Sequence, residues 1–332
     1  MGFKFPKIIV LISLVGLSDC NFNLPTNHSN GNFDLQTLPQ EMLLYIPTYD
    51  GSNQATHPDV LFFPEGRNGI YFYLVMTPYP WSNNRYENPS LLFSRNGVNF
   101  YEPVTGLNPL VPQPTYDHNN DPDLIFNPLT EAFNIFYLET MRPDSQNTVL
   151  LTSPDGIKWR KKTAVHYDLK AGDPFILSPA VIFVDSCFYM FYVKAQSTTQ
   201  TEINYITSPD GEKWEKDSVN RVSTNFSAQF APWHLDVFRD ENYFYMLCCG
   251  PYKDLNLYLG QSTDLQNWKF LEEPIIRRSK NFYDSERIYR SSGIVQDNLL
   301  VVYFSLRTNL GQWRIGLKKF SLMELFKNDL HQ

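Results

Sequence analysis

The sequence predicts an all-β protein, a single-domain five-bladed β-propeller, from two repeated patterns and a scarcity of helix signals. The first pattern is a turn at residues 94–100, 153–159 and 208–214, with a looser copy at 262–268. The serines that begin these copies are 59, 55 and 54 residues apart. The first three copies carry Asn-Gly or Asp-Gly, which favour hairpin turns because these residues tolerate positive φ. An aromatic residue three positions after the glycine is expected to fill the gap between neighbouring sheets.

The second pattern is a short polar segment that runs into an apolar strand. It occurs at residues 57–63, 121–126, 178–183, 234–238 and 290–295. An aromatic-rich strand follows each copy, at 71–75, 133–137, 188–192, 243–247 and 299–303. Five such units of three or four strands predict five blades. Radial stacking buries both faces of each blade, which explains strands that are apolar on both sides.

The predicted propeller spans residues 42–320, with no linker that would divide it. Residues 42–49 are expected to close the ring as an outer strand. An irregular lead-in is expected at 21–41, and a tail at 321–332 is expected to contain a short helix.

The first 20 residues have the pattern of a signal peptide. Lys4 and Lys7 precede an apolar run at 8–17, which is too short to span a bilayer. Two cleavage interpretations remain open. Cleavage after Ser18 would release a soluble product, whereas residues 17–20 resemble a lipoprotein box that would place a lipid on Cys20. Asp19 fits that box poorly, because the position normally holds a small residue. Both interpretations predict export to the cell envelope or the extracellular space.

Composition narrows the class of partner. The net charge is −7 and no run of Lys or Arg forms a phosphate-binding stripe, so a nucleic-acid partner is not expected. Hydrophobic residues make up 42% of the chain, which excludes a disordered protein. Four cysteines are too few for a disulfide scaffold of this size. We expect a monomer without an organic cofactor, and a central structural cation such as calcium stays open.

The polar segments are the candidate functional site. The first strand of each propeller blade lines the central channel, so these segments should converge there. Residues two apart in a strand face the same side. The expected ring comprises His57, Asp59, Asp121, Asp123, Ser178, His234, Asp236 and Arg290. Clustered carboxylates shift one another's pKa values apart, and glycoside hydrolysis uses such a pair as acid and base.

At these residues the chain resembles the five-bladed glycoside hydrolases of families 43 and 62 and their relatives 32 and 68. The resemblance rests on the polar segments and the turns, and it covers the predicted propeller. It implies a blade-one Asp as base or nucleophile, an orienting blade-two Asp and a blade-three Glu as acid. Asp121 matches the blade-two Asp directly. Because His57 precedes the blade-one proline, Asp59 is a displaced candidate for the base. Ser178 stands where the acidic Glu would be expected.

Glu87 is the best substitute for that acid, although capping of a turn is an alternative role for it. It follows an aromatic loop that contains Trp81, and both Trp81 and Trp233 are candidate platforms for a sugar ring. Arg290 is a candidate clamp for an anionic substrate group, or else a structural ion-pair partner of a ring aspartate.

The remaining ring residues have two open interpretations. They could contact a ligand, or they could tie neighbouring blades together by accepting backbone N–H bonds. Two histidines among several carboxylates could also hold a metal. The sequence therefore predicts an exported glycoside hydrolase that acts through Asp59, Asp121 and Glu87. The alternative is a non-catalytic glycan-binding lipoprotein on the cell surface.

Overall fold

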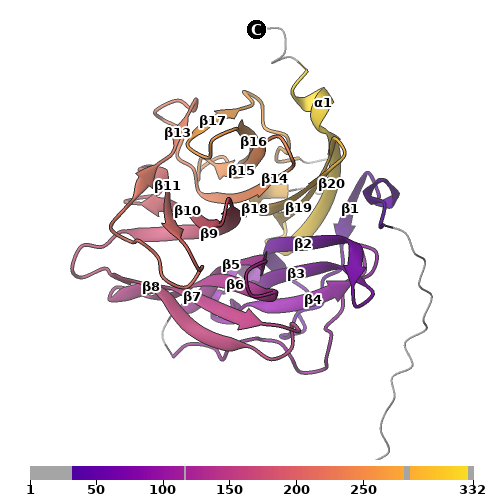
Figure 1. Ribbon diagram of the computed structural model, residues 1–332, viewed down its shortest axis with the longest axis horizontal. Helices are drawn as coiled ribbons and strands as arrows, with labels where there is room; N and C mark the ends of the chain where they lie inside the picture. Colours follow the sequence, from indigo (N-terminus) through magenta and orange to yellow (C-terminus); the bar gives the residue numbers. More distant parts are fainter. Residues whose placement is uncertain (1–31, 116, 280–284, 328–332) are drawn as a thin grey trace, which may run out of the picture. The chain divides into compact units, whose positions relative to one another are not determined.

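The computed structural model describes residues 32–115, 117–279 and 285–327. Five sheets follow one another around a common centre (Figure 1), which confirms the predicted five-bladed propeller. The signal-peptide pattern, Cys20 and most of the lead-in lie outside the described residues. Among the residues described, none of the helices has the length and apolar character needed to cross a membrane.

The first strand of every blade is innermost, and later strands follow outward. Blade one contains β2 (Ala55–Arg67), β3 (Ile70–Pro78) and β4 (Ser90–Ser94). Blade two contains β5 (His118–Asn127), β6 (Ala132–Met141), β7 (Ser145–Ser153) and β8 (Arg160–Asp168). Blade three contains β9 (Phe175–Val184), β10 (Cys187–Ala195), β11 (Thr201–Ser208) and β12 (Asn220–Arg221).

Blade four contains β14 (His234–Arg239), β15 (Phe244–Gly250), β16 (Asn256–Ser262), β17 (Asn267–Phe270) and the short parallel strand β13 (Ser223–Thr224). Blade five contains β18 (Ser285–Gln296), β19 (Leu299–Thr308) and β20 (Trp313–Ser321). Its outer strand is β1 (Glu41–Leu44), which pairs antiparallel with β20. This pairing closes the ring as the sequence predicts. The one α-helix in the described part of the chain is α1 (Leu322–Leu325).

Strand alternation places successive side chains between different pairs of blades. In β3, Leu74 packs toward blade five, whereas Tyr73 and Val75 pack toward blade two. In β6, Phe136 packs toward blade three and Ile135 back toward blade one. Each pair of neighbouring blades thus shares one apolar cluster, so both faces of a blade are buried.

The repeated turns take the conformation that their residues favour. Gly156 has a φ of 76°, and Asp155 accepts hydrogen bonds from the N–H groups of Ile157 and Lys158 at 2.8 and 3.0 Å. The aromatic residue that follows such a turn fills an interblade gap. Trp214, between β11 and β12 of blade three, meets Phe136 of blade two with ring centroids 5.7 Å apart.

Candidate functional site

The innermost strands of blades one to three share an unusual backbone conformation. His57, Asp121 and Ser178 each precede a proline and have φ values of 51°, 51° and 54°. A residue before proline ordinarily adopts an extended conformation, and positive φ strains a residue other than glycine. Strand pairing shifts register at all three positions, between Thr56 and Asp59, between residues 120 and 123 and between residues 177 and 180. These β-bulges occur where polar side chains point into the channel.

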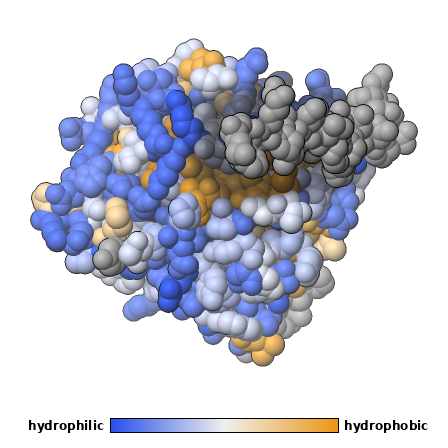
Figure 2. Space-filling view, turned by 90° about the horizontal axis from the view of Figure 1, so that it is seen from below, coloured by the Kyte–Doolittle hydropathy of each residue, from blue (hydrophilic) through white to orange (hydrophobic). Residues whose placement is uncertain are grey.

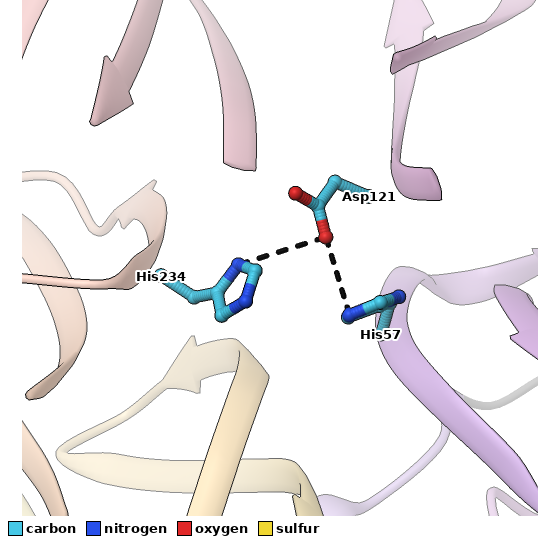
Figure 3. A group of neighbouring side chains, drawn as sticks. All are labelled: His57, Asp121 and His234. Carbon is cyan, nitrogen blue, oxygen red and sulfur yellow. Dashed lines mark ion pairs between the residues drawn. The ribbon is translucent and has the colours of Figure 1, made fainter. Parts of the chain in front are cut away.

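Three of those side chains form what we call the His–Asp–His group: His57, Asp121 and His234 (Figure 3). Asp121 Oδ1 lies 3.2 Å from His57 Nε2 and 3.6 Å from His234 Nδ1. The three side chains come from the innermost strands of blades one, two and four, and all are buried. One carboxylate oxygen therefore points between two imidazole rings.

The protein fixes two of these side chains while leaving one atom of each unused. His57 Nδ1 lies 3.0 Å from Thr77 Oγ1, which orients the ring. Asp121 Oδ2 accepts a hydrogen bond from the N–H of Ser178 at 2.9 Å. In contrast, His57 Nε2, Asp121 Oδ1 and both ring nitrogens of His234 are buried without a hydrogen-bond partner. Unsatisfied buried polar atoms are unfavourable and call for a ligand or a functional explanation.

Burial sets the protonation states of this group. Desolvation lowers the pKa of His57 to about 3 and that of His234 to about 4. Burial alone would raise the pKa of Asp121, but the neighbouring His234, His57 and Arg290 together lower it to about 2. At neutral pH the group therefore offers two neutral imidazoles and one carboxylate, the forms in which these side chains bind a metal.

Glu87 lies beside the His–Asp–His group. It is buried in the segment between β3 and β4, and its Oε2 atom is 3.7 Å from His57 Nδ1 without making a hydrogen bond. Its own backbone oxygen accepts the N–H of Asn119 at 3.1 Å, which fixes it against blade two. Burial raises the pKa of Glu87 well above its usual value, and the negative charges of Asp121 and Asp117 add to the effect.

A second histidine–carboxylate pair lies on the same side as Glu87. His118 Nδ1 contacts Asp117 Oδ1, and Arg142 clamps Asp117 through Nε at 2.7 Å and Nη2 at 3.0 Å. His118 begins β5, directly before the residue that holds the Glu87 backbone. Burial lowers the pKa of His118, although Asp117 opposes this shift. This pair stands outside the repeated polar segments, so no sequence pattern marks it.

Aromatic rings border the two histidines of the His–Asp–His group. Tyr289 meets His234 with ring centroids 4.2 Å apart, and Trp313 lies 5.1 Å from Tyr289. Tyr79 follows at 5.5 Å from Trp313 and 6.4 Å from His57. We call Tyr79, Trp313 and Tyr289 the aromatic wall. Trp313 itself is buried, and aromatic side chains next to a few polar groups are typical of small-molecule sites.

The other predicted aspartates form a separate three-aspartate group: Asp59, Asp123 and Asp236. Residues two apart do both face the channel, but each pair divides between this group and the His–Asp–His group. The aspartates accept hydrogen bonds from the N–H groups of Leu124, Val181 and Gly293 in other blades, those from Val181 and Gly293 at 2.9 Å. Burial raises the pKa values of all three, that of Asp236 to about 8.

Arg290 neutralises part of this charge. Its Nη2 atom donates to Asp123 Oδ1 at 3.3 Å and to the backbone oxygen of Pro179 at 2.8 Å. The three aspartates line one end of a cavity of about 490 Å³, together with mainly apolar residues of the innermost strands. Figure 2 shows an orange, hydrophobic area on one face of the molecule. The N–H bonds that Asp59, Asp123 and Asp236 accept from other blades confirm the sequence-based expectation that these carboxylates tie neighbouring blades together.

The remaining predicted residues take different places. Ser178 Oγ bonds to the backbone oxygen and N–H of Leu235, at 2.9 and 3.0 Å, and so joins blades three and four. Trp233 donates its indole N–H to Tyr289 Oη at 3.1 Å, behind the aromatic wall. Trp81 is exposed. Of the predicted catalytic residues, Asp121 and Glu87 lie around His57, whereas Asp59 lies in the three-aspartate group.

The His–Asp–His group fits a divalent cation better than the three-aspartate group does. Its potential ligand atoms lie within 4.8 Å of one another and have no hydrogen-bond partners. Two imidazoles and a carboxylate are a common ligand set for zinc and related metals, with further positions left for water and substrate. The three-aspartate oxygens are instead occupied by N–H donors and accompanied by Arg290.

The fold and the site together define a five-bladed propeller with a histidine–aspartate centre on its channel. No protein-family model matches the chain. The chain is 29% identical over 303 residues to an A type blood N-acetyl-α-D-galactosamine deacetylase of Flavonifractor plautii. That match covers 75% of this chain and 38% of the relative, so the chain spans well under half of the relative's length.

Solved structures show the same fold. An N-acetylgalactosamine deacetylase from F. plautii, in complex with blood group B trisaccharide, superposes with a TM-score of 0.76 at 23% identity, covering 86% of this chain and 96% of that one. A thermostable family-43 glycoside hydrolase gives 0.58 at 15% identity, covering 80% and 89%. An exo-1,5-α-L-arabinanase from a bovine ruminal metagenomic library gives 0.55 at 14%, covering 80% and 92%. The expected fold of the family-43 hydrolases is therefore confirmed.

Proposed function

We propose that the chain is a glycan-acting enzyme that removes the acetyl group from an N-acetylated sugar with the help of a divalent metal. One observation carries the proposal: the facing atoms of His57, Asp121 and His234 are buried, close together and without hydrogen-bond partners. The similarity to an N-acetyl-α-D-galactosamine deacetylase supports the reaction class.

His57, Asp121 and His234 are the residues that would hold the metal. A bound divalent cation polarises a carbonyl oxygen and lowers the pKa of an attacking water. Thr77 orients the His57 ring through Nδ1, and the Ser178 N–H orients Asp121 through Oδ2, so each ligand atom is directed toward the shared centre. This orientation from behind is the usual support of metal ligands.

We assign the role of general base to Glu87. Its buried Oε2 atom has no hydrogen-bond partner and lies next to the His–Asp–His group. In amide hydrolysis the base takes a proton from the attacking water. A pKa raised by burial makes the carboxylate a stronger base than it is in water, provided that it is ionised when substrate binds.

We assign to His118 the return of a proton to the leaving amine. Asp117 holds its Nδ1 atom and Arg142 fixes Asp117, so the ring orientation is determined by two successive contacts. A histidine that is oriented by a carboxylate is a common proton carrier in hydrolases. The C–N bond of the acetamide breaks, acetate leaves, and the sugar retains a free amine.

Glycoside hydrolysis is a second candidate function, favoured by the fold shared with family-43 enzymes. In this proposal Asp121 and Glu87 act as the carboxylate pair, and Asp59 would have to exchange its N–H partners to take part as base. The unpaired imidazole atoms have no role in that mechanism, which is why we favour deacetylation. We also retain export as a proposal, on the signal-like pattern of residues 1–20.

A product assay distinguishes the functions. The purified chain would be incubated with Zn²⁺ or Mn²⁺ and glycosides of N-acetylgalactosamine and N-acetylglucosamine. Release of acetate with a matching amount of free amine, abolished by a chelator and restored by metal, is the expected result. New reducing ends without acetate would favour glycoside hydrolysis instead. Glycan binding with neither product would favour a non-catalytic glycan-binding protein.

A further inference from the structure

Trp81 has a backbone conformation that a tryptophan rarely adopts. It lies in the turn after β3 with φ 52° and ψ 30°, and the next residue, Ser82, has a φ of 63°. Left-handed backbone at two consecutive residues other than glycine is strained and persists only where the surroundings enforce it. The indole is nevertheless 61% exposed, so core packing does not explain the choice of a large aromatic residue here.

Two blades hold this turn in place. The side-chain oxygen of Gln54, just before β2, accepts the N–H of Trp81 at 3.1 Å and the N–H of Trp313 at 3.2 Å. Trp313 in turn donates its indole N–H to Ser82 Oγ at 2.9 Å. The exposed indole is therefore carried on a turn that is bonded directly to the aromatic wall.

The position of Trp81 relates it to the site. It follows Tyr79 by two residues, and the Tyr79 ring lies 6.4 Å from His57, beside Tyr289 at 5.4 Å. A sugar ring bound against the aromatic wall would thus have a second aromatic surface available, the exposed Trp81 side chain in the turn after Tyr79. Rigid aromatic side chains bind sugar faces with little loss of conformational entropy, because few torsions are immobilised.

We propose that Trp81 stacks on a second sugar ring, adjacent to the one that carries the reacting acetamide. The substrate would then be an oligosaccharide or the end of a glycan chain. The identity of the reacting sugar rests on the function proposed above, whereas the stacking itself requires only that the chain binds an oligosaccharide.

The test uses Trp81→Gly, because glycine adopts positive φ without strain and the variant should fold at least as well as the parent. The substrates would be a methyl glycoside of an N-acetylated amino sugar and a trisaccharide that ends in the same sugar. We expect KM for the trisaccharide to rise about three- to tenfold, the range for loss of one aromatic contact, with kcat and the methyl glycoside unaffected. Trp81→Phe should restore most of the affinity.

Tyr45→Gly is the matched control, since Tyr45 is 71% exposed but lies just after β1 on the outer strand of blade five. It should leave both substrates unaffected. An equal change for both substrates in Trp81→Gly, or no change for either, would overturn the proposal. If the parent shows no turnover, calorimetric binding of the trisaccharide to parent and Trp81→Gly decides instead. Equal affinities, or no binding by the parent, would then also overturn it.

Discussion

The carboxylate of Asp121 is shared between blade three and the channel: Oδ2 accepts the N–H of Ser178 at 2.9 Å, which leaves Oδ1 directed at His57 and His234. A single side chain therefore joins two blades and contributes to the candidate metal site. A substitution at Asp121 can therefore affect metal binding through Oδ1 and stability through Oδ2, and the variants below are chosen to distinguish the two effects.

Asp121→Asn should abolish most of the metal affinity while keeping much of the interblade bond, since an amide oxygen can still accept the Ser178 N–H. Loss of an outer partner of a metal ligand typically weakens binding 10–100-fold, so loss of a charged ligand should weaken it by about 100-fold or more. Zn²⁺ titration calorimetry measures this. Asp236→Asn, in the three-aspartate group, is the control and should bind Zn²⁺ like the parent. Equal weakening in both variants would contradict the assignment of the site.

Glu87→Gln should remove turnover without removing the metal. The amide cannot take a proton from water, so kcat should fall about 10²–10⁴-fold, the usual contribution of a general base. Acetate release measures kcat, and Zn²⁺ affinity should stay close to that of the parent. A variant that keeps its turnover would exclude Glu87 as the base.

His118→Gln should slow the reaction in a way that depends on the leaving group. A proton donor matters most when the departing amine is strongly basic, so kcat for a sugar acetamide should fall by about 10²-fold. For an acetanilide, whose amine departs more easily, the loss should be smaller. Asp117→Asn should show the same pattern more weakly, because it orients the ring but transfers no proton to the substrate. Equal losses for both substrates would indicate a structural role.

Stability in acid should depend on the turn aspartates. Hydrogen bonds from Asn267 and its neighbours lower the pKa of Asp264 to about 2 in the folded chain. Because this pKa lies below that of the unfolded chain, the stabilisation is present above about pH 4 and is lost as the pH falls toward 2. Urea unfolding of the parent and Asp264→Asn should therefore differ at pH 6 and converge near pH 2. A constant difference across this range would contradict the prediction.

The fold could be predicted because its signals are local and repeated. Turns such as Asp155-Gly156 depend on the φ preferences of two residues and on side-chain bonds within the turn. Blade stacking buries both faces of a strand, so both faces are apolar. In β3 and β6, alternate residues accordingly pack into different interblade clusters. Neither property needs information from distant parts of the chain.

The candidate site was only partly predictable. The sequence placed His57 and Asp59 on the same side of one strand, and both do face the channel, but they belong to different groups. That division accompanies left-handed backbone at His57 and Asp121, where the proline rule favours an extended conformation. His118 was missed because its partner is its own neighbour Asp117, so no spacing or repeat marks the pair.

The recurrence of one backbone geometry before the proline of blades one, two and three has a consequence for how such a protein can diversify. The same position presents an imidazole, a carboxylate and a hydroxyl in turn, at His57, Asp121 and Ser178. In these three blades the position thus works as a socket whose occupant differs while the strand conformation stays the same. A new reactivity would require one codon change in one socket rather than a redesigned propeller.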